Sequence, residues 1–137
     1  MMMMMMMMGG TELTVTIPMV PDSVLLPNAQ RRLKHYVWGP HAKSLRAVTY
    51  QYAREVVPGG EVWAGPIRLS CVIAWPKPRR RCDFQAAAHA TKSLVDGLVD
   101  AGWMVDDDQV VGMDIEQVKA DPDDRAGWVR VSMSEAV

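Results

Sequence analysis

Apolar and polar residues alternate along four stretches of the chain, and this two-residue period is typical of strands with one buried face. The clearest case is residues 67–75, in which Arg68 and Ser70 separate apolar side chains. The same pattern predicts strands at residues 13–17, 110–118 and 128–133.

Two other stretches carry apolar residues three or four positions apart, which is the period of an amphipathic helix. The first is about residues 41–56, and Pro58–Gly60 is expected to end it. The second is residues 85–101, for which the helical period predicts an apolar side and a polar side. The apolar side comprises Ala87, Ala90, Leu94, Leu98 and Ala101, and the polar side comprises Gln85, His89, Lys92, Asp96 and Asp100.

The order of these elements, β-α-β-α-β-β, predicts an α+β domain with helices packed on one face of a small mixed sheet. Residues 22–40 are expected to form a loop, and residues 120–127 a turn between the last two strands. The chain has 137 residues, 49% of them hydrophobic, which suffices for one domain with an ordinary core. We expect that domain to span residues 11–137, after a leader or tag-like segment, residues 1–10, that is rich in methionine.

Composition excludes several classes of protein. Cys71 and Cys82 are the two cysteines, and they form no CxxC pair, so neither a disulfide scaffold nor a zinc site is expected. Both are interpreted as packing residues of a protein in a reducing, cytoplasmic setting. Outside the methionine run there is no apolar stretch of about 18 residues, so no membrane span is predicted.

The net charge is −1, and global charge therefore predicts no partner. The charges are nevertheless segregated, which can steer an anionic ligand even when the total cancels. A basic run at residues 77–81 precedes Asp83, Lys92 lies in the second helix, and residues 106–108 are three consecutive aspartates. Positive charge beside carboxylates is what an enzyme needs if it binds a polyphosphate and holds a divalent metal against it.

Residues 79–111 resemble the RusA family of Holliday junction resolvases, especially its phage-borne members. The match consists of the basic run, Asp83, Lys92 in the helix, Ala101–Gly102 and the segment 106–111, DDDQVV. Pro27–Asn28 followed by Arg31 and Arg32 is also similar to an early Pro-Asn-Arg loop of that family.

The resemblance implies a homodimeric endonuclease that resolves four-way and other branched DNA by paired symmetric nicks. It implies Mg²⁺ as the cofactor, with Mn²⁺ as a substitute, and the cytoplasm of a bacterium or phage-infected host as the location. The catalytic positions carried over are Asp83, Gln85, Lys92 and Asp107, and the metal ligands are Asp83, Asp106 and Asp107. The DNA-binding positions are Lys77, Arg79, Arg80, Arg81, Asn28, Arg31 and Arg32.

Gln85 departs from the family, which has aspartate at this position. If residues 83 and 85 were extended, their side chains would point the same way and two carboxylates could serve one ion. Gln85 offers a carbonyl oxygen but no charge, and ligand charge strongly influences affinity for hard cations. We therefore carry two hypotheses, a nuclease weakened at Gln85 and a branched-DNA-binding protein with impaired catalysis.

Simpler interpretations exist for each feature. The arginine run can be a solvated loop, and the three aspartates can lead into a strand. Lys92 can pair with Asp96 one helical turn away, and His89 can be an ordinary surface residue. These interpretations together give a third hypothesis, a small α+β protein whose charges serve solubility alone. The five tryptophans are expected in the core or at a dimer contact.

Overall fold

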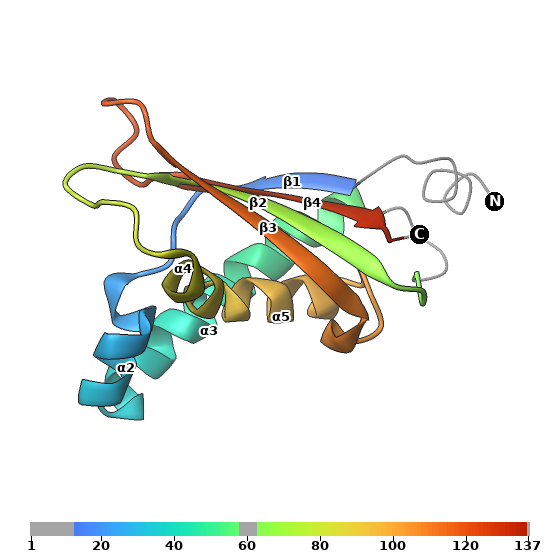
Figure 1. Ribbon diagram of the computed structural model, residues 1–137, viewed down its shortest axis with the longest axis horizontal. Helices are drawn as coiled ribbons and strands as arrows, with labels where there is room; N and C mark the ends of the chain where they lie inside the picture. The colour runs from blue at the N-terminus through green and yellow to red at the C-terminus, as the bar shows by residue number, and fades with distance from the viewer. Residues whose placement is uncertain (1–12, 58–62, 137) are drawn as a thin grey trace.

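Four strands form one mixed sheet, and the helices cover one face of it (Figure 1). The computed structural model describes residues 13–57 and 63–136. Segment 1–10 and the helix stop at Pro58–Gly60 lie outside the described residues. The elements are β1 (Leu13–Ile17), η1 (Ser23–Leu25), α2 (Pro27–Arg32), α3 (His35–Val56), β2 (Ile67–Trp75), α4 (Phe84–Ala90), α5 (Lys92–Asp100), η2 (Asp107–Gln109), β3 (Val110–Lys119) and β4 (Trp128–Glu135), where η marks a short 3₁₀ helix.

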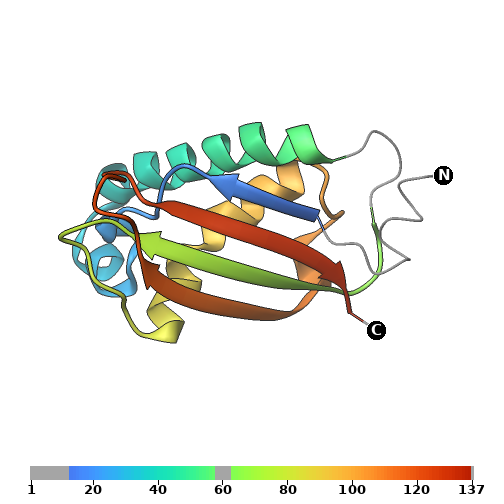
Figure 2. The ribbon, with the colours of Figure 1, turned by 90° about the horizontal axis from the view of Figure 1, so that it is seen from above.

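The strands lie in the order β1-β4-β2-β3, as Figure 2 shows from the side opposite the helices. β4 is antiparallel to both of its neighbours, whereas β2 and β3 run parallel. Val131 of β4 pairs with Val15 on one side and with Cys71 on the other. These three side chains are buried, so the alternation seen in the sequence sets which face of the sheet meets the helices.

Helices α3 and α5 pack closely over the buried face of the sheet (Figure 1). Gly97 permits this contact, because a Cβ at that position would lie 2.6 Å from the carbonyl oxygen of Arg46. The Trp103 indole N–H donates a 2.9 Å hydrogen bond to the carbonyl oxygen of Ala53 at the end of the same interface. The predicted α+β class, with helices on one sheet face, is confirmed.

The predicted strands are all present, and β3 and β4 extend one or two residues beyond their predicted ends. The predicted loop at residues 22–40 is wrong, because it contains η1, α2 and the first turns of α3. Asp22 caps η1 by accepting a 3.0 Å hydrogen bond from the Val24 amide. Pro27 occupies the first turn of α2, where its missing N–H costs nothing.

The predicted helix at residues 85–101 is two helices, α4 and α5, that meet at Thr91. Thr91 is fully buried, and its hydroxyl donates a 2.9 Å hydrogen bond to the carbonyl oxygen of Ala88. The predicted sidedness is confirmed, since Leu94 and Leu98 are buried whereas His89 is exposed. None of the described helices is both long and apolar enough to cross a membrane.

The two cysteines differ in burial. Cys71 is buried in β2, and its burial raises the pKa of its thiol to about 12. Cys82 is only half-buried, in the loop that precedes α4. The prediction that both are packing residues is therefore met fully only by Cys71.

Candidate nucleic-acid interface

The basic loop, residues 76–82, joins β2 to α4 and carries most of the predicted DNA contacts. Arg79 is half-buried, lies 4.4 Å from the centre of the Trp75 ring, and donates a 2.5 Å hydrogen bond to the carbonyl oxygen of Pro21. This burial lowers the pKa of the Arg79 guanidinium. Lys77, Arg80 and Arg81 are exposed, so Arg79 holds the loop while the other three cations face solvent.

Gln117 of β3 fixes the end of the basic loop. Its Oε1 accepts hydrogen bonds from the Trp75 indole N–H at 2.8 Å and from the Cys82 amide at 2.9 Å. Its Nε2 donates a 2.7 Å hydrogen bond to the carbonyl oxygen of Cys82. Sequence reasoning missed this residue, because no local pattern links it to a loop 35 positions earlier.

A basic hollow of about 580 Å³ lies between the basic loop and the end of β3. Its lining includes Arg79, Arg80, Arg81 and Lys119, and no carboxylate is among the lining residues. Lys119 was also not among the predicted DNA-binding residues, although it directly follows the predicted strand 110–118. Four cations around one concave surface favour binding of a phosphate backbone.

Asp83 is the N-cap of α4. Its Oδ1 accepts a 2.9 Å hydrogen bond from the Ala86 amide, which satisfies one of the free N–H groups at the start of the helix. Asp83 itself is extended, but Gln85 is helical, as the predicted helix from residue 85 requires, so the condition under which the two side chains would point the same way is not met. Gln85 is exposed on α4.

The early Pro-Asn-Arg segment lies beside α4. Asn28, Arg31 and Arg32 of α2 line a hollow of about 800 Å³ together with Asp83 and Gln85. The Arg31 guanidinium donates a hydrogen bond to the side-chain oxygen of Asn28. Predicted DNA-binding residues and predicted catalytic residues from distant parts of the chain therefore share one concave surface.

Lys92 begins α5 further along this side of the molecule. Its Nζ lies 3.7 Å from a carboxylate oxygen of Asp96, which is the pairing expected from the helical spacing. The Asp107 carboxyl has a raised pKa, chiefly because of the Asp106 side chain, and Lys92 and Asp96 make smaller, opposite contributions. Helix α5, which carries Lys92 and Asp96, contacts η2, which begins at Asp107.

The acidic turn, residues 106–108, is built around a capping box. Gln109 Oε1 accepts hydrogen bonds from the amides of Val105 and Asp106, at 2.7 and 3.0 Å. The adjacent side chains of Asp106 and Asp107 influence each other, which lowers the pKa of Asp106 and raises that of Asp107.

The predicted metal ligands are only partly brought together. Asp106 and Asp107 are adjacent, exposed carboxylates, and such hard oxygen donors are what a divalent cation such as Mg²⁺ prefers. Within residues 13–57 and 63–136, however, no three His, Cys, Asp or Glu side chains are grouped closely enough to hold a metal ion. Asp83 therefore does not complete a ready-made three-carboxylate site with Asp106 and Asp107.

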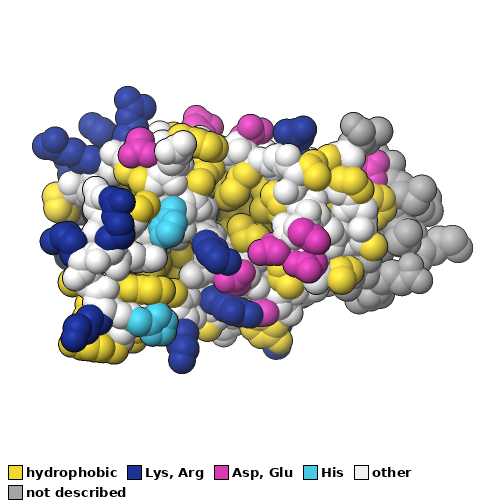
Figure 3. Space-filling model, turned by 60° about the horizontal axis from the view of Figure 1, so that its bottom comes forward, with side chains coloured by type: hydrophobic (Ala, Val, Ile, Leu, Met, Phe, Trp, Pro, Cys, Tyr) yellow, Lys and Arg dark blue, Asp and Glu magenta, His cyan; other side chains and the backbone are white. Residues whose placement is uncertain are grey.

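Charge is segregated on the side of the molecule that carries the helices. Figure 3 shows Lys and Arg side chains gathered at one end of this side, and a group of Asp and Glu side chains further along it. His89 lies between the two predicted sites, since it lines both the hollow beside α2 and a second one that contains Lys92 and Asp96. Its ring nitrogen Nε2 lies 3.1 Å from Oε1 of Gln30.

The chain was compared with known proteins in two ways. No protein-family model matches it, and no curated protein matches it.

Proposed function

We propose that this chain is an Mg²⁺-dependent endonuclease of four-way and other branched DNA that acts as a homodimer. The main support for the proposal is that predicted DNA-binding and catalytic residues line two adjoining hollows. Arg31, Arg32, Asp83 and Gln85 share one hollow, and His89 joins that hollow to the one that contains Lys92. Residues separated by more than sixty positions thus line one surface, which a charge pattern serving solubility alone does not require.

The acidic turn would hold the metal ion through Asp106 and Asp107, with water and phosphate oxygens as the remaining ligands. When bound, Mg²⁺ supplies an activated water and neutralises charge that develops on the phosphate. Asp83 uses Oδ1 for the helix cap, and because it is not grouped with Asp106 and Asp107, we assign its second carboxylate oxygen to a water of that ion rather than to the ion itself. The Lys92 ammonium, on the helix that contacts η2, would stabilise negative charge on the phosphate oxygens.

The exposed cations of the basic loop and of α2 bind phosphates without reading the base sequence. Such binding weakens steeply as salt rises, because each phosphate contact releases counterions. A four-way junction has two-fold symmetry, and a dimer would present one site to each of two symmetric strands.

A second function, branched-DNA binding without cleavage, is favoured by the two positions that weaken the metal site. Gln85 carries no charge, and the Asp83 carboxylate already caps α4. Binding through the basic surface would be unaffected by either feature.

The test compares a four-way junction with a linear duplex of equal length, first in a gel shift and then in cleavage with Mg²⁺ or Mn²⁺. The proposed nuclease cuts the junction, and Asp107→Asn abolishes cutting without abolishing binding. Asp123→Asn is the matched control, because Asp123 is an exposed aspartate in the turn before β4. Binding by the wild-type chain with cutting only by Gln85→Asp would establish the second function, and equal affinity for junction and duplex would contradict both.

A further inference from the structure

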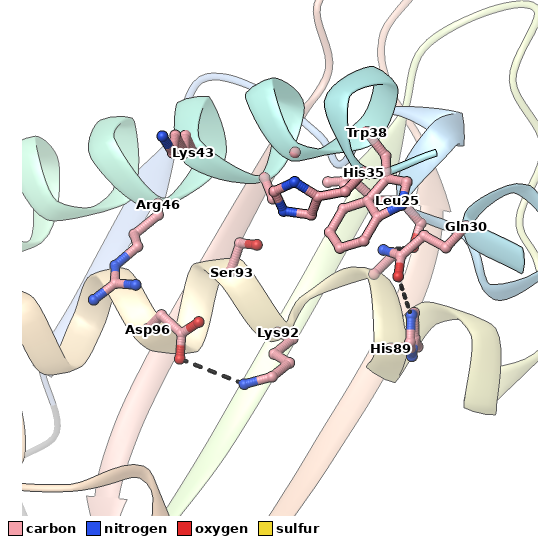
Figure 4. A pocket seen from close by; sticks show the side chains of 13 residues that line it. Leu25, Gln30, His35, Trp38, Lys43, Arg46, His89, Lys92, Ser93 and Asp96 are labelled. Atoms are coloured by element: carbon pink, nitrogen blue, oxygen red, sulfur yellow. Dashed lines mark hydrogen bonds and ion pairs between the residues drawn. The ribbon is translucent and has the colours of Figure 1, made fainter. Parts of the chain in front are cut away.

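A hollow of about 410 Å³ lies between α3 on one side and α4 and α5 on the other (Figure 4). His35 and Trp38 project into it from α3, and their rings meet edge to face with centroids 4.6 Å apart. Leu25, Ala42 and Ala90 add apolar surface to the lining. This volume lies within the range of about 300–1,000 Å³ that is usual for small-molecule sites, which are mostly apolar with a few polar groups.

The polar groups of the hollow are predominantly cationic. Lys43, Arg46 and Lys92 line it, whereas Asp96 is the one carboxylate among its lining residues. Arg46 is held by Asp100, with hydrogen bonds of 2.6 and 2.9 Å, and Lys92 lies beside Asp96. For Lys43, by contrast, no ion pair occurs within the described parts of the chain, which leaves its ammonium for an external anion.

Aromatic rings beside a cation that has no ion-pair partner are a combination that suits single-stranded nucleic acid, in which bases stack and phosphates meet Lys or Arg. The hollow also adjoins the surface of the proposed function, because His89 lines both. We propose that this hollow binds one unpaired nucleotide of a DNA strand, with the base against Trp38 and His35 and the phosphate at Lys43. The inference rests on the proposed function only for the source of the strand, since some branched DNA, such as a flap, contains unpaired nucleotides.

The experiment measures fluorescence anisotropy of a short labelled oligothymidylate and, separately, of a linear duplex. Trp38→Ala removes the main stacking surface, and Ser93→Phe fills the hollow from α5 without changing charge. Both variants should bind the single strand about five- to a hundredfold more weakly, the range expected for loss of one stacked base. Their duplex affinity should not change.

Trp38→Phe is the matched control and should retain single-strand binding, because it keeps an aromatic face at the same position. Far-ultraviolet circular dichroism checks that Trp38→Ala is folded. If Trp38→Ala is unfolded, Ser93→Phe tests the proposal independently. Unchanged single-strand affinity in folded Ser93→Phe overturns the proposal, as does an equal loss of single-strand and duplex affinity.

Free deoxyadenosine 5′-monophosphate, added as a competitor, distinguishes a strand from a free nucleotide. Little competition is expected, because the free nucleotide lacks the neighbouring phosphates that reach the basic surface. Effective competition would overturn the assignment to a DNA strand. If the proposed function is wrong, the wild-type chain should bind junction and duplex with equal affinity. Trp38→Ala should still weaken single-strand binding in that case.

Discussion

The basic loop and the acidic turn are both charged and largely exposed, but they are held in different ways. Gln117 makes hydrogen bonds to Cys82 at the end of the basic loop and to Trp75 just before the loop, and Arg79 is fixed against Trp75 and Pro21. The acidic turn is held by its own capping box and by Gln109 Nε2, which donates hydrogen bonds of 2.9 and 2.8 Å to the carbonyl oxygens of Trp63 and Gly65. The predicted DNA-binding cations are thus anchored by a glutamine of a neighbouring strand, whereas the predicted metal-binding carboxylates lie in a turn that its own glutamine ties to residues 63–65.

The largest expected effect is on DNA affinity when the exposed cations of the basic loop are removed. Arg80→Gln with Arg81→Gln should weaken junction binding about tenfold or more for each arginine, since a charged hydrogen bond contributes about 1.5–3 kcal/mol. The slope of log affinity against log salt should become shallower by about 0.9 per lost contact. Arg125→Gln, in the turn before β4, is the control. An unchanged salt slope would show that these arginines do not touch phosphate.

Gln117→Leu tests whether the sheet preorganises the basic loop. The change leaves the indole N–H of Trp75 and both backbone groups of Cys82 without their partner, and each such loss costs about 1–3 kcal/mol where water cannot replace it. Urea unfolding should show lower stability, and DNA affinity should fall with an unchanged salt slope. Glu116→Gln, at the neighbouring exposed position, should alter neither. Wild-type stability of Gln117→Leu would refute the preorganised loop.

Periodicity predicted the strands and the apolar side of α4 and α5. A strand with one buried face needs an apolar residue at every second position, and a helix needs one at every third or fourth position. It did not predict α2, which is one and a half turns of mainly polar sequence that buries no residue of its own. The Asp106–Asp107 pair could be anticipated from adjacency in the sequence. Three features could not be anticipated from the sequence, because each depends on how the elements pack: the role of Gln117, the helix cap at Asp83 and the hollow at Trp38.

Variants of Asp83 can distinguish two roles of its carboxylate: the observed N-cap of α4 and the proposed role at the metal site. Asp83→Ala removes the N-cap of α4 and should lower the free energy of unfolding by about 1 kcal/mol. Asn is a comparable N-cap, so Asp83→Asn should keep wild-type stability while losing cleavage, if the second oxygen serves the metal. Thermal unfolding and junction cleavage, measured on both variants, distinguish these outcomes. Wild-type cleavage by Asp83→Asn would leave Asp83 as a helix cap only.

The acidic turn should oppose DNA binding whenever no cation is bound there. Asp106→Asn with Asp107→Asn removes negative charge from a fully exposed site, and without divalent metal it should raise junction affinity severalfold at low salt. Added Mg²⁺ should raise the affinity of the wild-type chain but not that of the double variant. The measurement is a gel shift with and without EDTA. An equal response of both proteins to Mg²⁺ would place the ion elsewhere.

The smallest expected effect concerns the ion pair that links α3 to α5, between the two charged regions. The hydrogen bonds from Arg46 lower the pKa of the Asp100 carboxyl. A lowered folded-state pKa means that the stabilisation is present above the unfolded-state value of about 3.9, and is lost as the pH falls through the folded-state pKa. Because the pair is largely exposed, it contributes less than about 1 kcal/mol.

Asp100→Asn should therefore be slightly less stable than the wild-type chain in urea at neutral pH, and the difference should vanish in acid. Subtracting one unfolding curve from the other cancels the remaining carboxylates, which titrate in both proteins. Lys43→Gln changes a cation on the same helix without breaking this pair, so its stability difference should not vary with pH in the same range. A difference for Asp100→Asn that persisted in acid would mean that the side chain stabilises the α3–α5 contact by packing, and that the charge of Asp100 contributes nothing.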